Sequence, residues 1–386
     1  MNSPIWAPIW ALGTMTGTSG DGMVDLALLQ TDGHHVTSFG PWTLSPYPPT
    51  VTALIAEATQ AALAWNFEGP EPAVFQTAEH ALTQGHATAI QAFLKAHGIP
   101  PTQVAVIGFH GQTVLHRPPQ RAALHRPLRP GTPGRTRQLG NGPLLAQLTG
   151  IGTAYDFRTR DVAAGGQGAP LAAAYHNALL DTAGIPPQAA VLNLGGVANI
   201  SARTPQGMVA FDTGPANAPL NDWTARHTGL PMDRDGALAR AGQVDEPLLA
   251  RLLQHPHLAA PYPKSLDRSA FQASMVEGLT LEDGAATLTA FTAASIGRGL
   301  DLLPTRPRHL IVCGGGRRNP AMMDALQTRA QVTPLQAEQV GWRGDAIEAE
   351  CFAFLAVRTL HGDPISYPGT TGVPTPLPGG QLARAP

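Results

Sequence analysis

A chain of 386 residues is too long for one ordinary hydrophobic core, so we expect two domains. Hydrophobic residues make up 43% of the chain and charged residues only 13%, which excludes a disordered protein. The 25 Lys and Arg residues nearly balance the 27 Asp and Glu residues, and the net charge of -2 favours small-molecule partners over nucleic acid or an anionic membrane.

The cysteine content and the first residues indicate a cytoplasmic protein. Cys313 and Cys351 are the only cysteines, and neither has a second cysteine at metal-ligand spacing, so no disulfide framework is expected. Residues 1–10 carry no positive charge and are interrupted by proline. No apolar run reaches the roughly 20 residues that span a bilayer, so we expect neither a secretion signal nor a membrane span.

The first predicted element is a β-hairpin over residues 13–29, with a turn rich in glycine and hydroxyl groups. Glycine allows positive φ and a close approach to an anion, and turn N–H groups and hydroxyls donate to phosphate oxygens. Asp21 can hold a divalent cation, usually through water. The pattern predicts a phosphate-binding hairpin, although an ordinary hairpin turn explains the same residues equally well.

Further elements follow in a strand, helix, strand order. We expect a strand at 36–44, helices at 50–65 and 74–97, and a buried strand at 103–109. That strand ends in His110-Gly111-Gln112-Thr113, at the end where α/β folds bind ligands. Residues 116–137 are crowded with Pro and Arg, which predicts a surface loop or flap whose arginines could equally be solubilising charge.

Glycine-rich turns recur in the second half of the chain, at 165–168, 194–197, 213–215 and 312–316. Residues 191–201 form a second predicted hairpin in the style of the first, which suggests an internal duplication. Helical spacing is found at 287–303 and 343–360, and the tail from residue 362 is predicted to be an irregular arm.

Three of these segments together suit a nucleotide. The first hairpin can bind phosphates, residues 211–217 can supply an opposing carboxylate, and Gly314-Gly315-Gly316 can lie against the nucleoside. No GxxxxGK[ST] P-loop and no GxGxxG strand-helix fingerprint is present, so P-loop and Rossmann classes lose their main support.

The segment 155–170 places two carboxylates beside two arginines ahead of a glycine turn. A carboxylate over a sugar can remove a proton from water or a hydroxyl, and an arginine can neutralise phosphoryl charge. Asp161, next to the turn, is the better candidate for the base. The alternative is a surface ion-pair cluster that caps a helix.

The order of these motifs resembles the anhydro-N-acetylmuramic acid kinases, a family within the superfamily of sugar kinases, acetate kinase, actin and heat-shock-chaperone ATPases. The resemblance covers nearly the whole chain. It is carried by residues 15–19, 108–113, 156–158, 161, 165–171, 192–201, 211–217 and 313–319. One departure lies in the first hairpin, where Asp21 and Asp25 are one residue further apart than in the family pattern.

The resemblance implies an α/β, two-lobed actin-like or ribonuclease H-like ATPase fold with an interlobe active-site cleft. We expect an N-terminal lobe at 1–140, onto which a helix at 343–361 packs back, a C-terminal lobe at 141–342 and the irregular tail at 362–386. It also implies a reaction in which water opens the 1,6-anhydro ring of anhydro-N-acetylmuramic acid while ATP phosphorylates O6. The expected products are N-acetylmuramic acid 6-phosphate and ADP, in cell-wall sugar recycling.

The same resemblance assigns the site residues. It implies that Asp161 acts as the catalytic base, that ATP and Mg²⁺ are the cofactors, and that Asp21 and Asp212 are the metal-side acids. The residues expected to bind the cofactor are Gly17, Thr18, Ser19, Gly20, Asp21, Gly22, Gly195, Gly196, Asn199, Asp212, Gly214, Gly314, Gly315 and Asn319. The residues expected to bind the sugar are His110, Gln112, Arg158 and Glu348.

Alternatives remain at two levels. By itself, Glu348 is equally explained as a helix-surface carboxylate and His110 as a structural histidine, and we expect His176 to be structural. The same fold could serve a kinase of another sugar or a carboxylate, or a non-catalytic nucleotide or sugar sensor. The presence of Asp21, Asp161 and Asp212 together argues against a sensor.

A homodimer is suggested by the resemblance, while nucleic-acid and membrane partners are not expected.

Overall fold

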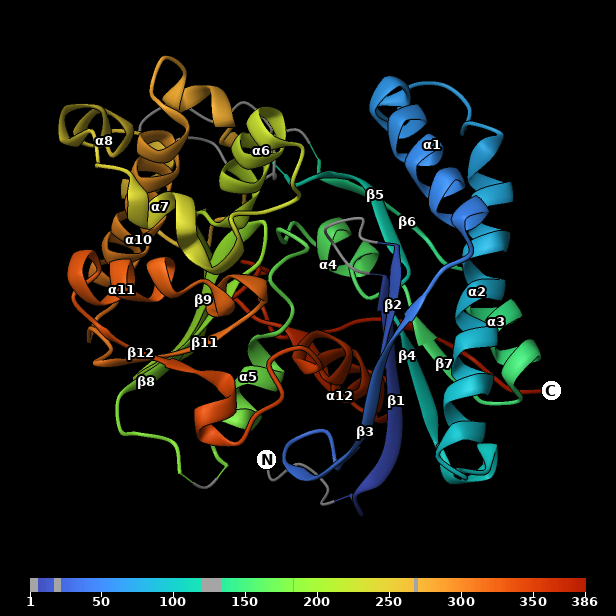
Figure 1. Ribbon diagram of the computed structural model, residues 1–386. Helices are drawn as coiled ribbons and strands as arrows, with labels where there is room; N and C mark the ends of the chain where they lie inside the picture. The colour runs from blue at the N-terminus through green and yellow to red at the C-terminus, as the bar shows by residue number, and fades with distance from the viewer. Residues whose placement is uncertain (1–5, 17–21, 120–132, 183, 267–269) are drawn as a thin grey trace. The chain divides into compact units, whose positions relative to one another are not determined.

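The computed structural model describes residues 6–16, 22–119, 133–182, 184–266 and 270–386. The chain forms two compact units, Met1–Asp181 with Ala346–Pro386, and Thr182–Asp345. Each unit is built around its own β-sheet (Figure 1). The division differs from the expected lobe boundary at residue 140, because strand β7 (Thr153–Tyr155) pairs with the first sheet and keeps the following residues in the first unit.

The sheet of the first unit has the strand order β15-β7-β4-β1-β2-β3. β1, β2 and β3 form an antiparallel meander, and β4 and β7 continue the sheet in parallel with β1. The strands other than β7 are β1 (Ile9–Thr16), β2 (Met23–Thr31), β3 (Val36–Pro46), β4 (Val106–Phe109) and β15 (Gln381–Ala383). The parallel strands bring the end of β4 beside the end of β1, so Thr14 lies opposite Phe109.

Helices cover this sheet in the first unit. They are α1 (Pro49–Trp65), α2 (Val74–Ala96), α3 (Gly142–Thr149), α4 (Thr159–Ala163), α5 (Ala173–Leu179) and α12 (Ile347–His361). Leu12 and Ile107 join a core with Leu82 and Ile90 of α2. Successive strand residues face opposite sides of a sheet. Gly13, which follows Leu12 in β1, therefore faces the other side and meets α12.

Two segments expected to be irregular contain short strands. β5 (Gln112–Arg117) pairs antiparallel with β6 (Arg135–Leu139), so strands form both ends of the predicted loop at 116–137. In the tail, β13 (Pro364–Ser366) pairs with β14 (Leu377–Pro378), and β15 pairs with β7. The tail is therefore partly ordered: β15 joins the first sheet and β13 pairs with β14, while the residues between these strands form turns and loops.

The sheet of the second unit has the order β10-β9-β8-β11-β12. Its strands are β8 (Ala189–Leu194), β9 (Val197–Thr204), β10 (Gly207–Pro215), β11 (His309–Cys313) and β12 (Thr333–Gln336). The expected second hairpin is present, with Val191 of β8 opposite Ser201 of β9. β8, β9 and β10 form an antiparallel meander and β11 and β12 run parallel to β8, which repeats the arrangement of the first sheet.

The α-helices of the second unit are α6 (Asn217–Thr228), α7 (Ala237–Ala241), α8 (Glu246–Leu252), α9 (Pro256–Ala259), α10 (Leu281–Asp301) and α11 (Pro320–Arg329). Ile296 of α10 and Leu326 of α11 pack with strand residues such as Ile200 and Leu310 in one core. Short 3₁₀ helices occur in the two units at Pro101–Gln103, Arg234–Gly236, Ala273–Val276, Gly315–Arg318 and Ala337–Val340.

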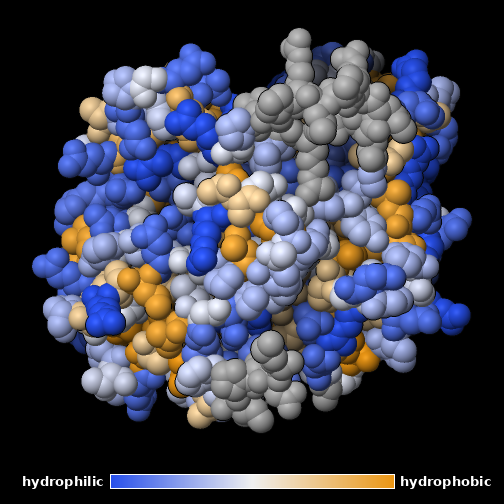
Figure 2. Space-filling view, turned by 180° about the vertical axis from the view of Figure 1, so that it is seen from behind, coloured by the Kyte–Doolittle hydropathy of each residue, from blue (hydrophilic) through white to orange (hydrophobic). Residues whose placement is uncertain are grey.

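Both cysteines, Cys313 and Cys351, are buried as free thiols. On the face shown in Figure 2, apolar residues lie in small groups between polar and charged ones. Within the described ranges, none of the helices is both long and apolar enough to cross a membrane.

Candidate active site

The first unit places His110 and Arg158 in contact. His110 follows β4, and its backbone N–H donates to Thr14 O at 3.0 Å, next to the end of β1. Arg158 Nη2 donates to His110 Nε2 at 3.1 Å, so Nδ1 carries the ring proton and donates to Gly111 O at 2.9 Å. Burial, with the charge of Arg158, lowers the pKa of His110 to about 3. The imidazole is therefore a neutral acceptor held beside a cation.

Asp161 is buried in α4, with only 1% of its surface exposed. Its Oδ1 accepts from the backbone N–H of Gly168 at 2.6 Å, and its Oδ2 accepts from Thr371 Oγ1 at 2.5 Å. A Cβ at Gly166 would lie 2.3 Å from Oδ1, so this position requires glycine. A carboxylate has about four acceptor sites, and two donors leave capacity for a water proton.

The glycine turn joins Asp161 to the pair formed by His110 and Arg158. Arg158 Nη1 donates to Gly168 O at 2.6 Å, and the N–H of the same glycine bonds Asp161. The other acid of the segment, Asp156, instead accepts from Thr159 at 2.6 Å in an exposed contact. The segment 155–170 is thus not one surface ion-pair cluster, because its two acids have separate environments.

Gln112 and Glu348 also belong to the first unit. Gln112 begins β5 and is half-buried, and its side chain donates to Thr113 O at 3.2 Å. Glu348 lies half-buried in the first turn of α12. Burial, with the negative charge of Glu348, raises the pKa of the Cys351 thiol, and Arg158 opposes this shift. Glu348 and Arg158 therefore both act on the charge environment of this buried thiol.

The predicted phosphate-binding turn lies outside the described residues at positions 17–21. Gly22 is described, and its φ of +75° is in the left-handed region that favours glycine. The role of the turn itself stays a prediction.

A buried polar network holds the strand that leads into this turn. Thr14 Oγ1 lies 2.6 Å from His86 Nδ1, and Tyr47 Oη lies 2.6 Å from His86 Nε2. Thr16 Oγ1 completes the network 2.8 Å from Tyr47 Oη. Sequence reasoning missed it, because a histidine in the middle of an amphipathic helix gives no signal of a partner on a distant strand.

Three glycine-containing turns converge in the second unit. Gly195 O accepts from Asn217 N at 3.0 Å, and the Asn217 side chain donates to Leu194 O at 2.8 Å. Gly314 has a φ of +75°, and a Cβ there would lie 2.4 Å from Asn193 Oδ1. The turns after β8, β10 and β11 are therefore neighbours, as the nucleotide prediction requires.

Some of these glycines are not required by contacts within the chain. A Cβ at Gly195 would meet no described atom closer than 3.6 Å, and one at Gly315 none closer than 4.0 Å. Gly196 O accepts from the N–H groups of Ala216 and Ala218, which fixes the hairpin turn to the start of α6. Open space over a glycine backbone suits a ligand that approaches closely.

Asp212 and Asn199 lie opposite one another on β10 and β9. Asp212 is buried, and its Oδ2 accepts from Leu266 N at 2.7 Å. Gly214 follows a bulge in β10, and a Cβ there would lie 2.7 Å from Ser295 Cβ. Asn319 caps α11 by accepting from Met322 N at 3.2 Å, a structural role that the cofactor prediction did not include.

Sequence reasoning also missed a lysine and a histidine beside Asp212. Lys264 Nζ donates to His257 O at 2.7 Å and lies 5.6 Å from the centre of the Phe211 ring. Burial lowers the pKa of Lys264 to about 8, against the opposing effect of Asp212. His257 Nε2 lies 2.9 Å from Asp212 O, and burial lowers the pKa of His257 to about 4. The prolines around Lys264 predict a turn but not its neighbours.

Asp212 is the described acid that the sequence prediction assigns to a metal ion. Among the residues that the structure describes, no three His, Cys, Asp or Glu side chains form a metal-binding group. Mg²⁺ commonly takes one or two carboxylates and keeps several waters. Asp212 is one such carboxylate, and its Oδ2 accepts from Leu266 N.

Each α/β unit contains a meander of three strands extended by two parallel strands, which is the topology of the actin-like, ribonuclease H-like fold class. Within that class, residues 10–382 match the family described as anhydro-N-acetylmuramic acid kinase. The chain belongs to this family of phosphotransferases, as its relatives also show.

Curated relatives of that name match over nearly their full length. The protein of Rhizobium rhizogenes is 59% identical over 378 residues, covering 98% of this chain and 100% of that protein. The protein of Mesorhizobium japonicum is 58% identical, with 97% and 99% covered. The protein of Caulobacter vibrioides is 47% identical, with 96% and 98% covered.

Proposed function

We propose that this chain uses ATP to convert 1,6-anhydro-N-acetylmuramic acid and water into N-acetylmuramic acid 6-phosphate and ADP. Membership in the family supports the substrate and the phosphoryl transfer. The observation that carries the hydrolytic step is Asp161, a buried carboxylate fixed by two hydrogen-bond donors beside a glycine turn. A fixed carboxylate of this kind is what a general base requires.

In the proposed reaction, Asp161 takes a proton from water as the water oxygen bonds to C1 of the sugar. The bond between C1 and the bridging O6 breaks, and O6 accepts the γ-phosphoryl group of ATP. ADP is the leaving group. Because the two steps are coupled, O6 bonds to the phosphoryl group as it leaves C1. The negative charge that develops on O6 is taken up in this bond, so no free alkoxide forms.

The substrate-binding role falls to His110, Gln112, Arg158 and Glu348. His110 stays neutral at physiological pH, since its pKa is near 3, and cannot add a positive charge to the site. Arg158 bonds both His110 and Gly168, so its guanidinium is fixed before the sugar binds. Fixed polar groups lower the entropic cost of orienting a substrate.

ATP would lie against the turns that contain Gly195, Gly196, Gly314 and Gly315, where open glycine backbone supports a close approach. Asp212 would contact Mg²⁺, which neutralises phosphate charge during transfer; Asp21, the other acid expected at the metal, lies outside the described residues. Asn199 and Gly214 surround Asp212 in the same sheet and complete this side. We also propose a cytoplasmic location and a homodimer. Gel filtration with light scattering would test the homodimer.

The experiment combines turnover with a matched pair of variants. Purified protein with Mg-ATP should release ADP only when the anhydro sugar is present, and the product should gain the mass of water plus a phosphoryl group. Asp161→Asn should lower kcat by about 10²- to 10⁴-fold, the usual range for a general base. Its KM for ATP should stay near the wild-type value.

Asp156→Asn is the control, because Asp156 lies in the same segment but contacts Thr159 and Gln381. Its positive φ is one that asparagine tolerates. Normal turnover by the Asp161 variant would contradict the assigned base, and ADP release without the sugar would contradict the proposed coupling.

A further inference from the structure

The C-terminal tail contacts the proposed base directly. Thr371 is fully buried, and its hydroxyl donates to Asp161 Oδ2 at 2.5 Å. Its carbonyl accepts from the N–H of Gln167 at 2.7 Å. One threonine of the tail therefore contacts both the carboxylate and the glycine turn that bonds the other carboxylate oxygen.

The turn that carries Thr371 is closed by its own hydrogen bonds. Tyr367 O accepts from the N–H groups of Thr370 at 3.0 Å and Thr371 at 3.2 Å. Tyr367 N donates back to Thr370 Oγ1 at 3.1 Å. These bonds fix the backbone at Thr371, so the position of its hydroxyl depends on the position of the whole turn.

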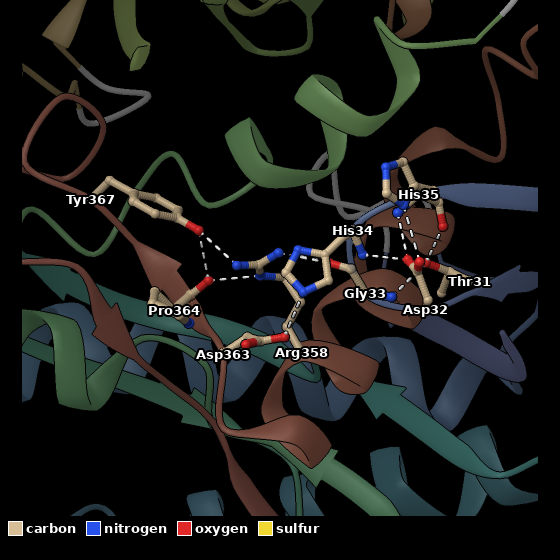
Figure 3. A network of polar contacts seen from close by, with 9 residues as sticks. All are labelled: Thr31, Asp32, Gly33, His34, His35, Arg358, Asp363, Pro364 and Tyr367. Carbon is tan, nitrogen blue, oxygen red and sulfur yellow. Dashed lines mark hydrogen bonds and ion pairs between the residues drawn. The ribbon is translucent and has the colours of Figure 1, made fainter. Parts of the chain in front are cut away.

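Arg358 of α12 anchors this turn (Figure 3). Its Nη2 donates to Tyr367 Oη at 2.7 Å, and its Nε donates to Pro364 O at 2.7 Å. Its Nη1 donates to Gly33 O at 2.6 Å, in the connection between β2 and β3. Arg358 is buried, so its guanidinium holds three chain segments in one arrangement. Its rigid planar donor set suits such a junction.

We propose that Thr371 is a positioning residue for Asp161, held in place by Arg358 and Tyr367. The inference rests on the proposed function, because it requires Asp161 to be the base. An ionised carboxylate only accepts hydrogen bonds, and both of the contacts described here come from donors. With one donor on each oxygen, the plane of the carboxylate is fixed. The lone pairs that remain for the reacting water therefore point in a fixed direction.

Without the hydroxyl of Thr371, only the bond from Gly168 would orient the carboxylate, which could then rotate away from the reacting water. Misplacement of a catalytic group by about 1 Å can cost on the order of 100-fold in rate. If Thr371 had a purely structural role, only the size of its side chain would affect the turnover rate.

The test compares Thr371→Val, which keeps the shape and loses the hydroxyl, with Thr371→Ser, which keeps the hydroxyl. We expect Thr371→Val to lower kcat by about 10- to 100-fold, with an unchanged KM for ATP. Thr371→Ser should retain kcat within about threefold. Thr359→Val is the matched control, because the Thr359 hydroxyl also bonds the tail, at Gly379 O, but not Asp161.

Wild-type kcat in Thr371→Val would overturn the proposal, as would equal losses in the Val and Ser variants. Asp161→Asn measured in parallel separates the two hypotheses. If that variant turns over normally, the proposed base is wrong. If it is inactive while Thr371→Val is normal, only the positioning role fails.

Discussion

At the scale of single residues, the first unit buries histidines in their neutral form. Burial lowers the pKa of His86 to about 3, and burial together with Arg158 does the same for His110. Both rings use their nitrogens in polar contacts within the unit. An imidazole that is neutral in the fold takes up a proton on unfolding once the pH is below its ordinary value of 6.5.

These histidines make the stability of the protein depend on pH. Above pH 6.5 these histidines are neutral in both states, and the free energy of unfolding is at its full value. As the pH falls from 6.5 toward 3, the unfolded chain binds protons that the folded chain does not, so the free energy of unfolding falls. At pH 4.5, each should have lost on the order of 2–3 kcal/mol of the free energy of unfolding. Urea unfolding at pH 7 and pH 4.5 should show a smaller pH dependence for His86→Gln than for the wild type. The control is His80→Gln, an exposed position on the same helix. An unchanged pH dependence in His86→Gln would contradict the expectation.

At this scale, the sequence predicts the chemical role of a side chain but not the residues that contact it in the fold. An acid beside arginine and a glycine turn predicts a base at Asp161, whereas Thr371 stands 210 residues away along the chain. A threonine in a Pro- and Gly-rich tail predicts only a turn. The contact depends on how β13 and β15 place the tail, which no local pattern records.

At the scale of elements, α12 lies unusually close to the first sheet. A Cβ at Gly13 of β1 would lie 1.7 Å from Ala349 O, and one at Gly108 of β4 would lie 1.9 Å from Phe352 O. The colliding atoms are backbone, which cannot rotate away. Glycine at these two positions therefore allows the helix that carries Glu348 and Arg358 to dock.

Gly13→Ala or Gly108→Ala should consequently lower the free energy of unfolding by about 3 kcal/mol or more, as overpacking against a backbone does. Gly152→Ala is the control, since its Cβ would only touch Ala383 O at 3.7 Å, and its effect should stay below about 1 kcal/mol. Thermal or urea unfolding measures both. Equal stability of the Gly13 and Gly152 variants would show that α12 is not docked as described.

Long elements were predictable and short ones were not. The segments 50–65 and 74–97 correspond to α1 and α2 within a residue or so, because their composition, rich in Ala, Gln and Leu, favours helix. β6 and β15 contain five and three residues and are specified by the strands with which they pair. Their sequences alone look like loop.

At the scale of the whole molecule, the two sheets share one arrangement of five strands, and the first sheet adds the antiparallel edge strand β15. The duplication was visible in the sequence as two glycine-rich hairpins, and it is present as two meanders with parallel extensions. The division between the units was harder to predict, because the chain leaves the first unit at Asp181 and returns to it at Ala346. The site prediction depends on the same duplication, since its glycine turns recur at corresponding strand ends.

The central claim is that opening of the anhydro ring by water is coupled to phosphorylation of O6. The most direct measurement is turnover in ¹⁸O-labelled water, with the sugar phosphate analysed at once by mass spectrometry. Unlabelled product kept in the same water for the same time controls for exchange at C1. The account predicts one labelled oxygen at C1 for each ADP released. Phosphorylated product without the label, while ADP is released, would show transfer to an existing hydroxyl and contradict the claim.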